Sequence, residues 1–328
     1  MLNNDTQGLQ LAEKKYNRSL FYKRYGIGII MIAMMLLLSL TSKKFLTPSN
    51  ILNVLSTISI NGCIALGMVF VITAGGIDLT VGALLAWGSV VIGMLLQYFG
   101  TVESIPLVCF IAIVSCGLMG LVNGLLITRF SIFPFVVTLA MSLVIRGLAT
   151  ALCGGYSFAV AVSAFTKIGL GKIGIVPIPA IILLVIAIIA YFLMHWTRYG
   201  RYVYASGGNI NAAIAAGVNV RRTQAITYMI SGLFTGAAAI IMTAKINASQ
   251  PNIGVGYETD AIAACVIGGT SFAGGVATIP GTLIGIVIIG LIYNGMNLLG
   301  VESYWQTVCK GTLIVLAVLI DKFVNQKR

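Results

Sequence analysis

Carboxylates are the side chains of this sequence best suited to acid–base or ion chemistry, and the chain has only eight of them. Asp78, Glu258 and Asp260 lie beside or within apolar segments, whereas the others lie in predicted tails or short loops. A charge held at membrane depth is costly, which makes these three candidates for a pathway or gating role. Each also lies at the start of a predicted helix, where a carboxylate satisfies free backbone N–H groups. The sequence leaves capping and gating open as alternatives.

Two glycine pairs interrupt apolar runs and provide further candidates. Gly75-Gly76 precedes Ile77-Asp78, and Gly268-Gly269 precedes Thr270-Ser271. Helices broken in this way often mark a substrate path in transporters. A plain tight turn between two spans is the alternative, and the sequence does not decide between them. The candidate pathway or gating residues are therefore Gly75, Gly76, Asp78, Glu258, Asp260, Gly268 and Gly269.

Several kinds of chemistry have no residues to support them. The sequence contains no GxxxxGK[ST] loop for nucleotide phosphates, and its one histidine, His195, supplies neither a metal cluster nor a Ser/His/Asp triad. The six cysteines form no CxxC pair, so we expect reduced packing residues. We therefore expect no cofactor, no metal and no enzymatic activity. Any energy must come from an ion gradient or from a separate ATPase.

The elements that position these residues are predicted to be membrane helices. Of the 328 residues, 59% are hydrophobic and 9% are charged, whereas soluble domains carry about 25% charged residues. Lipid must therefore be the main solvent, and spans of roughly 20 apolar residues allow about ten helices in an all-α membrane protein. The predicted spans are 25–40, 51–73, 80–98, 106–127, 132–152, 174–194, 225–244, 259–273, 279–298 and 304–320.

The distribution of charge predicts the orientation. Lys and Arg gather before the first span, after the sixth and after the last, which places both termini in the cytoplasm. The same bias explains the net charge of +12 without nucleic acid, since no basic run is interleaved with aromatic residues. Residues 1–24 are predicted to be a cytoplasmic tail, 25–320 a single transmembrane domain, and 321–328 a second cytoplasmic tail.

The longest predicted cytoplasmic connection, residues about 195–224, contains an alanine-rich stretch. Its core favours a short helix, which Asn209 or Asn211 would cap and Gly217 would end. A helix with small side chains that projects into the cytoplasm can seat in a groove of a partner. The alternative is a surface helix that lies flat on lipid.

At this connection the sequence resembles the permease subunits of bacterial ATP-binding-cassette importers. Their motif is Glu-Ala-Ala, three residues and then Gly, and Asn211-Ala212-Ala213 followed by Gly217 keeps that spacing with Asn in place of Glu. This departure resembles the monosaccharide branch, typified by ribose permeases. The stretches that support this branch are 75–82, 256–264, 268–275 and 294–301.

The resemblance implies an importer permease fold in the bacterial cytoplasmic (inner) membrane that carries a ribose-like monosaccharide. The implied partners are a second permease copy or related chain, a cytoplasmic ATPase, an extracytoplasmic sugar-binding protein and membrane lipid. The alternatives are the same machinery for another sugar, a furanose signal or a branched-chain amino acid, an ion-coupled secondary transporter, and a passive channel. The residues expected to couple to the ATPase are Gly208, Asn209, Asn211, Ala212, Ala213 and Gly217.

Overall fold

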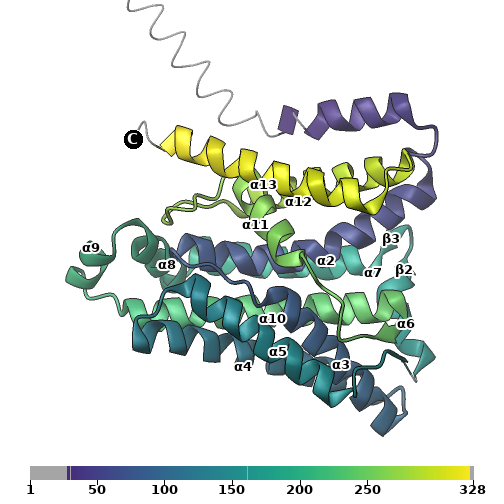
Figure 1. Ribbon diagram of the computed structural model, residues 1–328, viewed down its shortest axis with the longest axis horizontal. Coiled ribbons are helices and arrows are strands. Elements are labelled where there is room, and N and C mark those ends of the chain that lie inside the picture. Colours follow the sequence, from purple (N-terminus) through teal and green to yellow (C-terminus); the bar gives the residue numbers. More distant parts are fainter. Residues whose placement is uncertain (1–27, 30, 161, 326–328) are drawn as a thin grey trace, which may run out of the picture.

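The computed structural model describes residues 28–29, 31–160 and 162–325, and this part of the chain is almost entirely helical (Figure 1). A helix over Met31–Thr41 comes first. The helices that follow are α2 (Pro48–Thr73), α3 (Val81–Phe99), α4 (Ile105–Phe130), α5 (Pro134–Leu152), α6 (Thr166–Leu170), α7 (Ile178–Trp196), α8 (Arg198–Gly208), α9 (Ile210–Ala215), α10 (Val220–Ile246), α11 (Tyr257–Ile267), α12 (Ile279–Leu298) and α13 (Ser303–Asn325), with a 3-10 turn, η1, at Ser163–Phe165.

Strands are minor features of the described chain. β1 (Phe158–Ala159) pairs with β4 (Ala248–Ser249), and β2 (Lys172–Ile173) pairs with β3 (Val176–Pro177), both in antiparallel register. The β2–β3 hairpin and α6 lie at one end of the molecule, and α8 and α9 lie at the opposite end (Figure 1). These two ends are called the hairpin end and the α9 end below.

Seven helices of the described residues are long and apolar enough to cross a membrane: α2, α3, α4, α5, α7, α10 and α12. The prediction of about ten spans also included 25–40, 259–273 and 304–320, which correspond to Met31–Thr41, α11 and α13. The count of ten and the cytoplasmic side of both termini stay predictions. The tail predicted over 1–24 lies outside the described residues, and α13 extends to Asn325, into the tail predicted over 321–328.

Proline and glycine explain where many of these helices begin and how closely they pack. Proline occupies one of the first two positions of α2, α4, α5, α7 and α12, where its missing N–H costs no hydrogen bond. Most residues of α2 and α10 are buried, whereas only a minority of residues in α4, α5 and α7 are buried. A Cβ atom at Gly232 or Gly236 of α10 would clash with the backbone of α4. These two glycines thus allow α10 and α4 to cross closely.

Two non-helical segments interrupt the helical layers and lead into the interior. Residues 74–80 run from the α9 end back to the start of α3, and residues 250–256 run from the hairpin end to the start of α11 (Figure 1). The two starts meet, because a Cβ atom at Gly82 would collide with the Glu258 carboxylate and the Gly254 carbonyl. Irregular backbone at membrane depth is tolerated where protein surrounds it.

The span predicted over 259–273 is wrong in its bounds. α11 has 11 residues, Tyr257–Ile267, which is about 16 Å of helix and roughly half of the hydrocarbon thickness. The helix stops because Gly269 adopts a positive φ of 89° in a tight turn. Residues 268–278 are apolar enough to extend a hydropathy window, but they form a loop.

Candidate functional site

The α9 segment has the local structure that its sequence predicts. The Asn209 side-chain oxygen accepts a hydrogen bond of 3.0 Å from the Ala212 backbone N–H, which caps the helix. Gly217 follows the helix with a φ of 81°, a conformation that favours glycine. α9 projects from the rest of the molecule at its end (Figure 1). The expected short helix, its Asn209 cap and its glycine stop are confirmed.

The exposed face of α9 differs from the face expected from the alanines. Asn211 and Ala212 are exposed, but Ala213 is only 3% exposed and packs inward. Ile210 and Ile214 are exposed instead, Ile214 by 58%, and their spacing of four residues puts them on one face. The alanine-rich composition of the segment does not indicate this pair, although the spacing of the two isoleucines does. Ala213 therefore belongs to the packing of the segment, not to its outer surface.

The C-terminal turn of α8 is inserted between two backbone segments of the membrane domain. A Cβ atom at Gly207 would collide with the Thr73 carbonyl at the end of α2, and a Cβ atom at Gly274 would meet the Gly207 backbone. The same Thr73 carbonyl accepts a 2.9 Å hydrogen bond from the Gly275 N–H. Only glycine allows backbones to approach so closely.

A tyrosine of α8 strengthens this contact. The Tyr204 hydroxyl donates a 3.0 Å hydrogen bond to the Ala277 carbonyl, in the loop that follows α11. Burial raises the pKa of the Tyr204 phenol, which keeps the hydroxyl protonated as the donor. The segment that carries α9 is therefore joined to the end of α2 and to the loop between α11 and α12.

Both predicted glycine pairs form tight turns at helix ends. Gly75 has a φ of 81°, and its N–H donates to the Ile72 carbonyl at 2.9 Å; Gly269 has a φ of 89°, and its N–H donates to the Val266 carbonyl at 2.9 Å. Each pair therefore lies in a turn at the end of a helix, and its role on a substrate path stays a prediction. Both turns also lie next to the backbone that Gly207 contacts, so the coupling candidates and the glycine candidates lie together at the α9 end.

Asp78 lies in the interior and does not cap α3 directly. Its side chain is fully buried, and one carboxylate oxygen accepts hydrogen bonds from the Thr80 N–H at 2.9 Å and the Thr80 hydroxyl at 2.5 Å. The other oxygen accepts a 2.8 Å bond from the Ser231 hydroxyl of α10. Asn123 of α4 donates to the Thr80 hydroxyl at 3.0 Å. Asp78 thus ties segment 74–80 to α10, and Thr80 ties it to α4.

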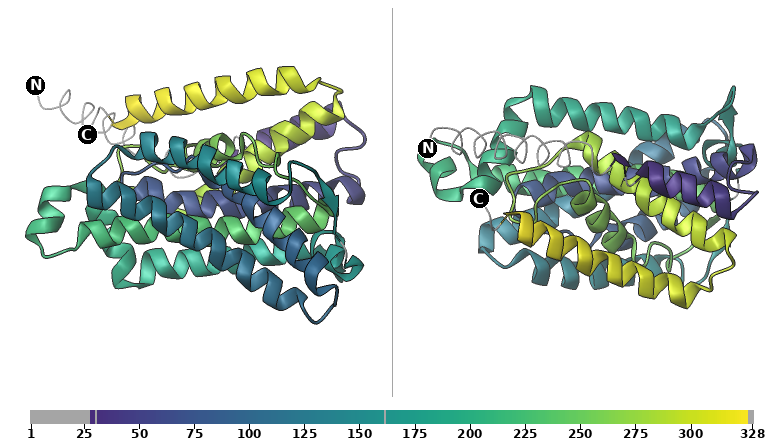
Figure 2. Two further views of the ribbon diagram at one scale, coloured as in Figure 1. Left: turned by 60° about the horizontal axis from the view of Figure 1, so that its bottom comes forward. Right: turned by 90° about the horizontal axis from the view of Figure 1, so that it is seen from above.

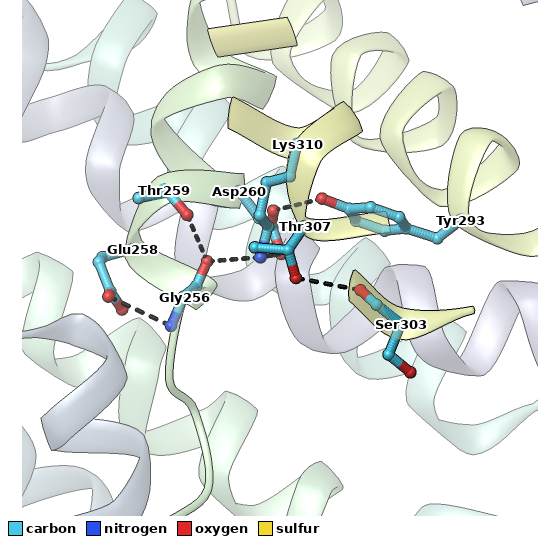
Figure 3. Close-up of polar contacts among 8 residues, drawn as sticks. All are labelled: Gly256, Glu258, Thr259, Asp260, Tyr293, Ser303, Thr307 and Lys310. Carbon is cyan, nitrogen blue, oxygen red and sulfur yellow. Dashed lines mark hydrogen bonds and ion pairs between the residues drawn. The ribbon is translucent and has the colours of Figure 1, made fainter. Parts of the chain in front are cut away.

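Asp260 belongs to a polar cluster at the start of α11 (Figure 3). Lys310 of α13 forms an ion pair of 2.9 Å with one Asp260 oxygen, and the Tyr293 hydroxyl of α12 donates to the other at 2.8 Å. Lys310 also donates to the Gly256 carbonyl at 3.0 Å. The cluster joins the N-terminal turn of α11 to two other helices. Nothing in the sequence indicated that Tyr293 would join this cluster.

Glu258 and Arg146 are the remaining charges near this turn. Glu258 accepts a 3.2 Å hydrogen bond from the Gly256 N–H, so it holds the backbone just before α11, and no side chain caps the first-turn N–H groups of this helix. The Arg146 guanidinium donates to the carbonyls of Pro251 and Ile253 at 2.9 and 3.1 Å. Arg146 therefore supports the turns of segment 250–256 through backbone carbonyls.

The contacts of these candidates are hydrogen bonds, close backbone approaches and one ion pair. Within the described residues, no group of three or more His, Cys, Asp or Glu side chains could hold a metal ion, and the cysteines are free thiols. A projecting helix, by contrast, is connected through backbone contacts to segments that enter the interior. Together with the apolar helices, this arrangement defines a multi-pass membrane permease.

Comparison with known proteins identifies the family. The chain belongs to the family described as branched-chain amino acid transport system / permease component, which matches residues 50–318. The ribose import permease protein RbsC of Bacillus subtilis (strain 168) is 41% identical over 97% of this chain and 98% of its own. RbsC of Escherichia coli (strain K12) is 39% identical over 89% and 92% of the two chains. The D-allose transport system permease protein AlsC of the same strain is 36% identical over 97% of each. No solved structure matches the chain.

Proposed function

We propose that this chain is the membrane-spanning subunit of an ATP-driven importer that carries a ribose-like monosaccharide across the bacterial cytoplasmic membrane. The observation that carries this proposal is the near full-length similarity to several proteins named ribose import permeases, at 34–41% identity. Family members are permease components, so the ATPase is a separate polypeptide in this scheme. An extracytoplasmic sugar-binding protein delivers the sugar, and a second permease copy completes the pathway.

In this proposal α9 is the docking element for the ATPase. Its exposed Ile210 and Ile214 provide an apolar face, and Asn211 and Ala212 are small enough to let a groove close around the helix. Asn209 and Gly217 fix the two ends of the helix, and Gly208 connects it to α8. Movement of α9 is passed through Gly207 to the end of α2 and to the loop after α11.

The same proposal gives the interior residues a gating role. Gly75 and Gly76 begin the non-helical segment that ends at Asp78, and Gly268 and Gly269 close α11, whose first turn holds Glu258 and Asp260. Motion at the α9 end would tilt both segments about these glycine turns. The buried polar contacts of Asp78 and Asp260 would keep each segment in register during that motion.

Other monosaccharides are the second candidate substrates. Relatives named for D-allose, L-arabinose and galactose transport are 34–36% identical over most of this chain, nearly as similar as several of the ribose permeases. An ion-coupled transporter that acts alone is the remaining alternative and needs no docking helix.

Uptake by cells that lack the gene tests the proposed substrate. The cells receive the gene on a plasmid, and uptake of labelled ribose, allose, arabinose, galactose and a branched-chain amino acid is measured with and without it. We expect restored uptake of ribose, or of one other monosaccharide. Restored uptake of the amino acid alone would contradict the sugar assignment.

A further inference from the structure

A cavity at the hairpin end has no part in the contacts described above. Its volume is about 370 Å³, and it lies between α2, α6, the β2–β3 hairpin and the end of α10. Figure 2 shows the same elements together at the end of the molecule opposite α9. The residues that line the cavity include Ser49, Asn53, Ser56, Leu170, Lys172 and Lys245.

The cavity is cationic and rich in hydrogen-bonding side chains. Lys172 and Lys245 line it together with two serines and an asparagine, and the lining includes no carboxylate. The Lys245 ammonium donates a 2.7 Å hydrogen bond to the Thr57 hydroxyl, a neutral partner. The ion pair found within the described residues is that of Lys310 with Asp260, so neither cavity lysine is neutralised there. Such a site favours an anion with several oxygen acceptors.

The surroundings of the cavity are apolar and exposed. Leu170, which lines it, and Ile173 and Ile175 of the hairpin have exposed side chains, Ile175 by 85%. Ile51 and Leu55 of α2 are also exposed, one turn apart and beside lining residues. Exposed apolar side chains around a cationic pocket at the end of membrane helices match the boundary between acyl chains and headgroups. A site for a soluble anion would not need exposed apolar side chains around it.

We propose that this cavity binds the phosphate-bearing headgroup of an anionic phospholipid from the outer leaflet, with phosphatidylglycerol as the simplest example. Lys172 and Lys245 pair with the phosphodiester, and Ser49, Asn53 and Ser56 supply hydrogen bonds to its oxygens or to the headgroup hydroxyls. The acyl chains lie along Leu170 and the exposed face of α2. The site is independent of sugar transport, so its failure and the failure of the proposed function are distinguishable.

Native mass spectrometry of the full chain in detergent tests the proposal. The protein is titrated with phosphatidylglycerol and, separately, with phosphatidylcholine. The double variant Lys172→Gln/Lys245→Gln should lose phosphatidylglycerol affinity by about tenfold or more, given the attraction of two lysines for an anionic surface. The matched control is Lys167→Gln, which removes one positive charge from exposed α6 without lining the cavity, and it should keep the affinity.

Three further measurements test whether charge, the shape of the cavity or phosphate alone accounts for lipid binding. Lys172→Arg/Lys245→Arg keeps both charges and should keep binding. Ser56→Phe fills the cavity without changing charge and should weaken binding even if the double glutamine variant proves unstable. Excess inorganic phosphate should not displace the lipid.

Three results would overturn the proposal. The first is equal affinity for the two lipids, and the second is displacement by phosphate alone. The third is a double glutamine variant that binds lipid normally but loses affinity for a sugar-binding protein, because that result would assign the cavity to an acidic protein segment.

Discussion

Asn209 holds the start of α9 with its side-chain oxygen, whereas Asn211, two residues later, is exposed and lies outside that cap. The difference permits a matched test. Asn209→Ala should weaken the helix by about 1 kcal/mol, because an N-cap asparagine satisfies a free N–H. Hydrogen exchange at the amides of residues 210–216 should accelerate in Asn209→Ala and stay unchanged in Asn211→Ala. Equal exchange in both variants would contradict the capping role.

The Lys310–Asp260 pair is the residue-scale contact with the largest expected energy. The side chains are 22% and 7% exposed, so removing Lys310 leaves a largely buried carboxylate without its cation. Lys310→Met should lower the free energy of unfolding by about 3 kcal/mol. This value is at the low end for breaking a buried ion pair, because Lys310 is partly exposed. Thermal unfolding in detergent measures the loss.

The double variant supplies the control for this pair. Lys310→Met/Asp260→Asn removes both charges and should recover part of the stability, because no unpaired charge remains. The single variant Asp260→Asn is measured as well. If the stability losses of Lys310→Met and Asp260→Asn simply add in the double variant, the ion pair does not stabilise the start of α11.

At the residue scale the sequence predicted contacts between neighbours and missed contacts across the chain. The cap of α9 lies within a few residues of its partner, so its chemistry is visible in the sequence. The pairing of Lys310 with an acid was foreseeable, because an isolated charge in a span needs a partner. The hydrogen bond from Tyr293 to Asp260 was not foreseeable, since many other polar side chains of the sequence could have made it.

At the scale of elements, the close packing of α8 against α2 is the contact on which coupling depends. Gly207→Ala would push a methyl group into the Thr73 carbonyl, whereas a methyl group at Gly208 meets only the Gly275 Cα at 3.9 Å. Overpacking of this kind costs about 1–3 kcal/mol. Both substitutions raise helix propensity by up to about 1 kcal/mol, so this gain cancels in the comparison.

The expected result is a split between the two glycines. Gly207→Ala should reduce sugar uptake severalfold with normal amounts of protein in the membrane, and Gly208→Ala, where a methyl group has room, should reduce uptake much less. Uptake per molecule of permease in intact cells measures the split. Equal uptake by the two variants would show that the α8–α2 contact transmits nothing.

Hydropathy predicted the full-length helices better than the broken ones. α4 and α7 are continuous apolar runs, and their predicted positions agree with the helices found. α11 was overextended because residues 268–273 carry no charge, so a hydropathy window does not detect the turn at Gly269. The non-helical segments 74–80 and 250–256 depend on protein around them, which only the folded arrangement reveals.

At the scale of the whole molecule, the α9 end and the hairpin end have different chemistry. Arg129, Arg198, Arg201, Arg221 and Arg222 lie near the α9 end, whereas the hairpin end carries lysines, among them Lys172 and Lys245. The proposed orientation places α9 in the cytoplasm and the cavity in the outer leaflet. A cysteine at Ala212 should therefore react with a membrane-impermeant thiol reagent only in inverted vesicles, in a background without the native cysteines. Reaction in intact cells would contradict this orientation.

Uptake of labelled ribose into proteoliposomes is the most direct test of the central claim, that the chain is a permease driven by another protein. One preparation contains the chain alone, under a sodium or proton gradient. The other contains the chain with its co-purified ATPase and sugar-binding protein, supplied with ATP. We expect labelled ribose to accumulate only in the complete preparation and only with ATP. Accumulation by the chain alone under an ion gradient would contradict it.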